Sequence, residues 1–400
     1  MNLERRIFYK LYLYCNIVVV LGYLYFGTIG GDLRGYVITS PMLLIVSLVV
    51  TVTMLYFICA VLYPIMSKVN IKPIIHINRY FVLDIIILIV NVSHGVFSIA
   101  YDVGLAGISI SSDVPKIPLY LSIVIQPTFL LYIYLAFTGD KKRKLLIVNA
   151  GVILLVSLLK GWLSSVMYLT FIAVMIYRDF FIREKVKFLI IASLGVILSP
   201  FFRFMKAVSS AVNGSESNIS YIEAVGAVIN YREINSISDF LNTYLFSVVE
   251  RFEHVGILYY VMVDDKVRYL FNDYNVTPFF AEGWIQNRLY SSFSSLNNVD
   301  MQFLLAEMIY PYVRWRVNTT LPVWLYVDAN NILLLISYVL FLMFICILLS
   351  KLISTRVVNL SWLATLVMLH HGWFYSYSLY IQALMVFAIM LVILRVARML

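Results

Sequence analysis

Four ionisable side chains fall within five positions of the stretch VVERFEHVG, residues 248–256: Glu250, Arg251, Glu253 and His254. A carboxylate or an imidazole can accept the proton of an attacking hydroxyl group, and a guanidinium can hold an anionic leaving group through two parallel hydrogen bonds. On a helix that turns about 100° per residue, the four side chains share an arc of roughly 160°. The pattern predicts either a site for acid–base chemistry or a solvated helix face with ordinary i,i+3 and i,i+4 contacts.

A second group of candidates could bind phosphate, and consists of Arg203, Arg232, Arg314, Arg316 and Lys160. The four arginines lie among many Tyr, Phe and Trp residues, whose rings can stack on sugars or lie at the level of lipid headgroups. A membrane-embedded substrate that carries both a phosphate and a sugar would need both kinds of group. The alternatives are arginines that reach to lipid headgroups at the ends of membrane spans, and a lysine that simply ends a helical hairpin.

Three histidines in apolar segments are further candidates. His370 and His371 could relay a proton, because ionisable residues are rare inside membrane segments, or could form an interfacial pair beside Trp373. His94 lies deeper in an apolar run, where a hydrogen-bonded packing role is the ordinary interpretation.

The composition shows which elements must position these side chains. Of 400 residues, 62% are apolar and 13% are charged, and the mean hydropathy is +0.90. Repeated apolar runs near twenty residues predict an all-α integral membrane protein with about ten transmembrane helices. We expect these segments at 8–28, 41–66, 80–100, 117–138, 144–159, 162–178, 187–202, 330–350, 357–376 and 379–396.

Charge along the chain predicts the topology. If the spans alternate and the N-terminus is cytoplasmic, the basic clusters, including DKKRK at 140–144 and RDFFIREKVK at 178–187, fall on the cytoplasmic side with both termini. The net charge of +9 is then a topology signal and gives no reason to expect a nucleic-acid partner. The charged N-terminus, which no A-x-A-like site follows, is expected to begin a retained first span.

The predicted spans divide the chain into three parts: helices 1–7 in residues 1–202, a large periplasmic loop in 203–329, and helices 8–10 in 330–400. Loops of this length usually carry function. Within it, the segment 231–263 has the pattern of one long amphipathic helix. The turn-rich NGSESN at 213–218 separates that helix from the seventh span.

Several chemistries lack their usual sequence signals. The loop holds no Gly-rich phosphate loop after a strand, no His-x-x-x-His pair and no G-x-S-x-G motif. The three cysteines, Cys15, Cys59 and Cys346, lie in separate apolar runs, which gives no sign of a disulfide framework or a zinc site. We therefore expect neither a metal nor a cofactor.

In this architecture the chain resembles the bacterial O-antigen polymerases, whose close relatives are the O-antigen ligases. The shared features are ten or more spans, cytoplasmic ends and one large periplasmic loop that carries Arg and His. The segment LLKGWLSSVMYLTFIAVMIY, 158–177, is similar to the family's segment in which a basic and a small residue, here Lys160 and Gly161, open a helix. Arg203 and Gly214 reproduce an Arg-x10-Gly spacing of some members.

The resemblance implies a reaction at the periplasmic face of the bacterial inner membrane. An undecaprenyl-diphosphate-linked oligosaccharide chain would be transferred en bloc to the non-reducing end of a second lipid-linked repeat unit. Arg251 with His254, Glu250 or Glu253 would perform catalysis, and the five cations above would bind diphosphate. Membrane lipids, a chain-length regulator and a repeat-unit flippase are the further partners that the resemblance suggests.

Two alternatives remain open at this point. An O-antigen ligase would perform the same chemistry with lipid A-core as the acceptor. A flippase or transporter of lipid-linked oligosaccharide belongs to another class, which commonly has repeat-related halves and discontinuous helices.

The charge asymmetry generates the first prediction. Alkaline phosphatase is active only after export, so fusions placed within residues 203–329 should be active, and fusions at residues 141–144 should be inactive. The opposite pattern would overturn the predicted topology and remove the basis for a periplasmic site.

Overall fold

The computed structural model describes most of the chain, in ranges with gaps between them: residues 2–33, 35–73, 80–104, 114–139, 143–160, 164–184, 200–201, 204–205, 207–208, 211–212, 220–231, 234–237, 239–240, 252–273, 276–293, 299–309, 317 and 319–397. Of the seventh predicted span, 187–202, only residues 200 and 201 are described.

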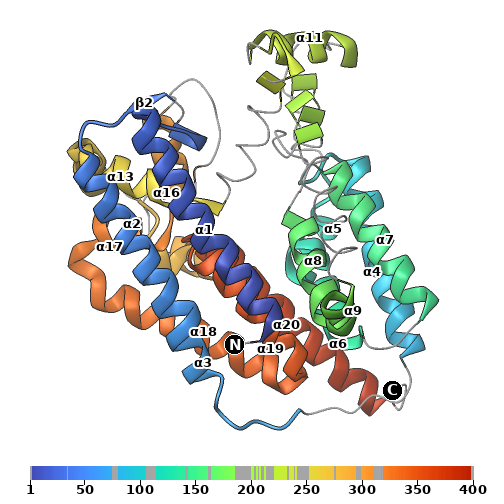
Figure 1. Ribbon diagram of the computed structural model, residues 1–400. Coiled ribbons are helices and arrows are strands. Elements are labelled where there is room, and N and C mark those ends of the chain that lie inside the picture. The colour runs from blue at the N-terminus through green and yellow to red at the C-terminus, as the bar shows by residue number, and fades with distance from the viewer. Residues whose placement is uncertain are drawn as a thin grey trace. The chain divides into compact units, whose positions relative to one another are not determined.

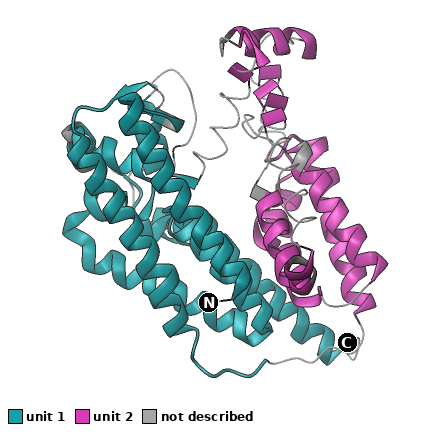
Figure 2. Ribbon diagram, viewed as in Figure 1, with its two compact units in different colours: residues 1–76, 250–398 teal, residues 77–249, 399–400 magenta. Residues whose placement is uncertain are grey.

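The chain forms two compact units (Figure 2). Unit 1 combines Met1–His76 with Glu250–Arg398, and unit 2 comprises Ile77–Val249 with the last two residues. The second half of the predicted loop, from residue 250 on, therefore shares a unit with the first and last helices of the chain. The predicted three-part division follows the order of the sequence and stays a prediction.

In its described residues, unit 1 is helical apart from one small hairpin and an isolated parallel bridge between Val276 and Val299 (Figure 1). Its elements are α1 (Leu3–Phe26), β1 (Thr28–Ile29), η1 (Gly31–Leu33), β2 (Tyr36–Val37), α2 (Pro41–Tyr56), η2 (Phe57–Leu62), α3 (Tyr63–Met66), α13 (Val255–Val263), α14 (Asp265–Asp273), η4 (Phe279–Ala281), α15 (Trp284–Phe293), α16 (Met301–Ile309), α17 (Leu321–Val327), η5 (Ala329–Asn331), α18 (Ile332–Ile353), α19 (Thr355–Ala364), η6 (Thr365–Leu369) and α20 (Phe374–Val396). Strands β1 and β2 pair antiparallel, with Thr28 opposite Val37 and Ile29 opposite Tyr36.

Unit 2 consists of helices in its described parts. They are α4 (Phe81–Ala100), α5 (Lys116–Ile125), α6 (Pro127–Thr138), α7 (Lys144–Leu159), α8 (Ser164–Ile176), α9 (Arg178–Arg183) and α11 (Tyr221–Tyr231).

The fold class is confirmed as all-α. In the described part of the chain, six helical segments are long and apolar enough to cross a membrane: Leu3–Phe26, Pro41–Met66, Phe81–Ala100, Lys116–Thr138, Ala329–Ile353 and Phe374–Val396. Shorter apolar helices at Lys144–Ser157, Ser165–Ile176 and Thr355–Leu369 coincide with the fifth, sixth and ninth predicted spans. Six of the ten predicted spans thus correspond to described helices that are long enough to cross a membrane. The number of ten spans stays a prediction.

Local sequence explains where several helices begin and break. Ser40 accepts a hydrogen bond from the Leu43 N–H and Pro41 occupies the first turn, so α2 starts there. Gln126 adopts a left-handed conformation with φ of 52°, which separates α5 from α6. The reason is Pro127, which lacks an N–H group and disfavours helical geometry in the residue before it.

The core of unit 1 lies between helices from both ends of the chain. α19 and η6 are buried along most of their length, and α18 and α20 pack on them. A hydrogen bond joins α1 to α19, because the guanidinium of Arg5 donates to the Asn359 side chain at 2.6 Å. α13 packs on α2 and α17, and its residues Val255–Val261 are all buried.

Two glycines of unit 1 share a left-handed conformation in different surroundings. Gly27 and Gly372 both have φ of 70°, and a Cβ atom at Gly27 would meet no atom within 4 Å. A Cβ atom at Gly372 would lie 2.8 Å from the carbonyl carbon of Thr320. The turn after η6 therefore needs glycine both for its backbone angle and for the close approach of another segment.

This pair generates a stability prediction. Gly27→Ala should cost about 1–2 kcal/mol of stability for the backbone angle alone. Gly372→Ala should cost about 1–3 kcal/mol more, because the methyl group also displaces the Thr320 backbone. Thermal unfolding of the purified variants in detergent checks the order, and equal losses would contradict the close approach at Gly372.

Candidate functional site

Three histidines meet in the interior of unit 1. His254 directly precedes α13, and His370 and His371 follow η6. The ring centroids of His254 and His371 are 3.8 Å apart, and those of His254 and His370 are 5.3 Å apart. All three side chains are buried, with exposed fractions of 0–3%. We call His254, His370 and His371 the histidine cluster.

Tyr12 of α1 contacts the cluster from one side. Its ring stacks on His254 at a centroid distance of 5.9 Å, and its hydroxyl is hydrogen-bonded to Nε2 of His371 at 3.0 Å. Helix α1 is one of the six candidate spans, so the cluster lies against a membrane-length helix.

Asn16, one turn further along α1, holds the backbone of the segment that carries His254. Its Nδ2 group donates to the Phe252 carbonyl at 2.9 Å, and its Oδ1 accepts from the His254 N–H at 3.0 Å. Because this backbone bonds to a side chain, it is not free to continue a helical hydrogen-bond ladder.

The structure therefore corrects the single helix expected over 231–263. His254 has φ of −134° and ψ of 2°, which is not helical, and α13 begins only at Val255. Glu253 and His254 consequently do not share a helical face, and the solvated-face alternative is also wrong for His254, which is buried.

Glu253 acts as a helix cap. Its Oε1 accepts from the Gly256 N–H at 2.5 Å, in the first turn of α13, and Tyr23 donates to its other oxygen at 3.5 Å. A carboxylate at a helix N-terminus satisfies an N–H group and favours the local dipole. Any proton transfer by Glu253 would compete with this cap.

Within the described part of the chain, His254 and His370 have unused hydrogen-bonding capacity. Neither ring nitrogen of His254 has a partner among the described residues, and the same holds for Nδ1 of His370. Nε2 of His370 lies 3.5 Å from the Thr51 carbonyl oxygen. Because a carbonyl oxygen can only accept a hydrogen bond, Nε2 is the protonated ring nitrogen of His370 in this contact. Burial holds the pKa of His254 well below its usual value, and the two other histidines lower it further. His254 is thus a neutral imidazole in which one ring nitrogen keeps its lone pair.

His370 and His371 are buried inside the protein, and their expected place at the membrane interface stays a prediction. Leu321, at the start of α17, donates its N–H to the His370 carbonyl at 3.0 Å. The segment from the long predicted loop thus covers the pair, so that His370 and His371 are interior residues of unit 1.

In unit 2, Lys160 and His94 form a second polar site. Nζ of Lys160 lies 2.8 Å from Nε2 of His94, and Nδ1 of His94 lies 2.7 Å from the Ser122 hydroxyl. Lys160 is 3% exposed, and burial lowers its pKa from 10.5 to about 8. The lysine predicted to bind diphosphate therefore directs its ammonium group toward a histidine inside unit 2. The hydrogen-bonded role expected for His94 is confirmed.

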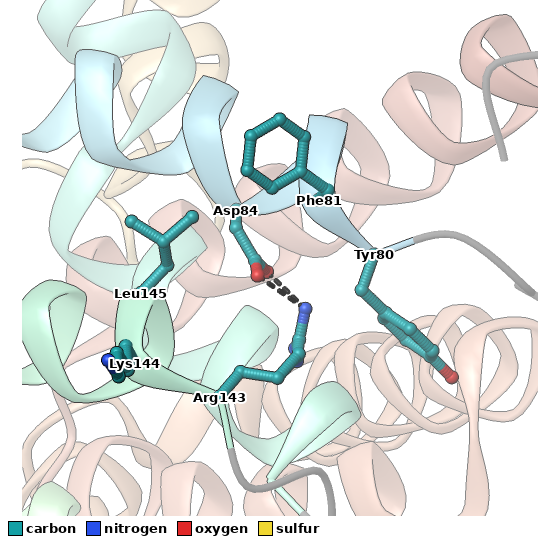
Figure 3. A pocket seen from close by; sticks show the side chains of 6 residues that line it. All are labelled: Tyr80, Phe81, Asp84, Arg143, Lys144 and Leu145. Atoms are coloured by element: carbon teal, nitrogen blue, oxygen red, sulfur yellow. Dashed lines mark hydrogen bonds and ion pairs between the residues drawn. The ribbon is translucent and has the colours of Figure 1, made fainter.

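A third site lies at the beginning of α4 and α7 in unit 2. Figure 3 shows the Asp84 carboxylate and the Arg143 guanidinium pointing toward each other. Both carboxylate oxygens lie 2.5 Å from Nη1 of Arg143. Tyr134 donates to the same carboxylate at 2.6 Å, and the Tyr80 ring lies 4.6 Å from the guanidinium carbon. The open pocket here has a volume of about 410 Å³. Asp84 neutralises Arg143, and Lys144 also lines the pocket, so the lining carries one positive charge in excess of the ion pair.

The other predicted site residues lie outside the described residues. They are Glu250, Arg251, Arg203, Arg232, Arg314 and Arg316. Of the nine predicted residues, the structure therefore describes Glu253, His254 and Lys160. Within the same ranges, no three His, Cys, Asp or Glu side chains are placed to hold a metal ion.

No protein-family model, no curated protein and no solved structure matches the chain.

Proposed function

We propose that the protein is an integral membrane glycosyltransferase that polymerises undecaprenyl-diphosphate-linked oligosaccharide repeat units at the periplasmic face of a bacterial inner membrane. The observation that carries the proposal is the histidine cluster. In a chain rich in membrane-length helices, His254 from the predicted loop 203–329 lies against His370, His371 and Tyr12 in the interior of unit 1.

The chemistry needs a proton acceptor at the site of attack. A hydroxyl oxygen of the acceptor sugar forms a bond to the anomeric carbon of the donor, and the bond from that carbon to the diphosphate oxygen breaks. The hydroxyl proton must go to a base, and undecaprenyl diphosphate departs with the electron pair. The neutral imidazole of His254, whose ring nitrogens have no partner among the described residues, is the group that we propose for this role.

The leaving diphosphate needs positive charge or hydrogen-bond donors. Arg251 adjoins the described segment 252–254 in sequence, so in our proposal its guanidinium is the group that stabilises the diphosphate. Arg203, Arg232, Arg314 and Arg316 keep their proposed diphosphate-binding role. Lys160 is withdrawn from it, because its ammonium already bonds to His94 inside unit 2.

The proposal generates a prediction for His254. Removing a general base usually lowers the rate by about 10²–10⁴, so His254→Ala should slow elongation to that extent. His254→Gln keeps hydrogen-bonding capacity but cannot take up a proton at neutral pH, so it should fold like the wild type and remain as slow as His254→Ala. The assay is elongation of purified lipid-linked repeat units by the reconstituted protein.

Two controls separate the outcomes. If the histidine only packs, His254→Gln should restore elongation, and that result would contradict the base assignment. In cells, failed elongation with intact ligation leaves lipid A-core capped by a single repeat unit, whereas loss of that unit as well would favour an O-antigen ligase.

A further inference from the structure

A row of polar side chains runs along one buried face of α4 in unit 2. Asp84, Asn91, His94 and Ser98 are spaced so that, at about 100° per residue, they fall within an arc of roughly 80°. Asp84, Asn91 and Ser98 are buried, with exposed fractions of 0–3%. α4 is long and apolar enough to cross a membrane, where such residues are costly and usually functional.

Helix α7 presents a matching polar face to α4. Asn149, Ser157 and Lys160 are buried on it or directly after it. The two helices pack closely at Gly95, where a Cβ atom would lie 2.8 Å from a methyl group of Val156. They are also joined by polar contacts: Asn149 donates to the Asp84 carbonyl at 3.1 Å, and Lys160 is hydrogen-bonded to His94. We call these facing polar residues of α4 and α7 the polar seam.

The seam has unused hydrogen-bonding atoms in its interior. The Ser98 hydroxyl and Oδ1 of Asn149 are buried without a partner among the described residues. Buried groups of this kind are normally paired, and water molecules are the usual partners in polar interiors. The seam is therefore suited to hold water near Ser98, one turn of α4 beyond His94, and near Asn149 at the Asp84 end of the seam.

The His94–Lys160 pair can hold only one excess proton. An ammonium and an imidazolium 2.8 Å apart would place two N–H groups against each other and two positive charges together. In the protonated pair, the Lys160 ammonium donates to Nε2 of His94, and Nδ1–H donates to the Ser122 oxygen. After one proton leaves, the Lys160 amine can accept from Nε2–H, and Nδ1 can accept from the Ser122 hydroxyl.

We propose that the His94–Lys160 pair binds one exchangeable proton, which gives the protein a proton-coupled step separate from glycosyl transfer. Loss of the proton allows the hydrogen bonds of the Ser122–His94–Lys160 chain to reverse. Ser122 is the residue whose carbonyl accepts from the Gln126 N–H at the break between α5 and α6, so the reversal acts directly beside a discontinuous helix.

The surroundings of the pair determine its working pH. The other titratable or charged residues on the helices packed around it are Tyr132, Tyr134 and Tyr168, the Asp84–Arg143 ion pair, and Lys144, Lys116 and Tyr120 near the starts of α7 and α5. Arg143 and Tyr134 already hold the Asp84 carboxylate. Since burial lowers the pKa of Lys160 to about 8, the proton is bound below that pH and released above it.

The test measures charge displaced by a pH jump. Proteoliposomes adsorbed on a solid-supported membrane are stepped between pH 7 and pH 9, and liposomes without protein give the background. The wild type should displace charge with a midpoint near pH 8. Lys160→Met has no titrating amine and Lys160→Arg stays charged at both pH values, so each should reduce the signal at least tenfold.

Matched variants make the result specific. Lys144→Met removes an exposed lysine at the start of the same helix and should behave like the wild type. His94→Gln offers the ammonium a carbonyl oxygen that can only accept, so its midpoint should move to higher pH. If Lys160→Met does not fold, Lys160→Arg and His94→Gln still decide the question.

The outcomes divide cleanly. A transient current or a sustained proton flux that disappears in Lys160→Arg supports the proton site. A wild-type signal no larger than the background, or a signal unchanged in Lys160→Arg and His94→Gln, overturns it. No lipid-linked sugar is needed, so the result is independent of the proposed glycosyl transfer.

Discussion

The side-chain amide of Asn16 is the contact on which the geometry of the histidine cluster depends. One amide satisfies both the Phe252 carbonyl and the His254 N–H, and it also donates to the Tyr12 carbonyl of its own helix at 2.7 Å. A buried backbone group that loses its partner costs about 1–3 kcal/mol, so a side chain that serves two such groups strongly constrains the chain path. The result is a non-helical segment that points His254 inward, followed by a buried α13.

Both units contain polar groups inside helical bundles, and the two arrangements suit different chemistry. In unit 1 His254 is a buried imidazole whose ring nitrogens have no partner among the described residues, and in our proposal it accepts a proton from a substrate. In unit 2 the Lys160–His94–Ser122 contacts are short and mutually satisfied, which suits a proton held within the protein. Buried polar side chains of this kind lower the stability of an apolar helical bundle. Their presence in both units therefore favours a functional role for each of the two arrangements.

The sequence predicted the helices well where apolar runs are long. The predicted segments 41–66 and 80–100 correspond closely to Pro41–Met66 and Phe81–Ala100, because continuous hydropathy determines both. It failed over 231–263, where local periodicity favoured one helix. The contact that interrupts that helix comes from Asn16, far away in the sequence, and no local pattern reveals it.

The candidate site was predictable only in part, for the same reason. The density of ionisable residues around 250–254 singled out His254, but its partners His370 and His371 come from the other end of the chain. Their burial could not follow from the neighbouring Trp373 and Tyr375, which also occur at membrane interfaces. The break between α5 and α6 at Gln126, in contrast, can be predicted from the proline that follows it, Pro127.

The burial of His254 is the central claim, and thiol accessibility tests it most directly. In a background with Cys15, Cys59 and Cys346 changed to alanine, His254→Cys is compared with Tyr269→Cys on α14, using a water-soluble maleimide on detergent-solubilised protein. The exposed fractions, 1% for His254 and 69% for Tyr269, predict rapid labelling at 269 and almost none at 254. Equally fast labelling at both positions would place residue 254 on a solvated surface and contradict the histidine cluster.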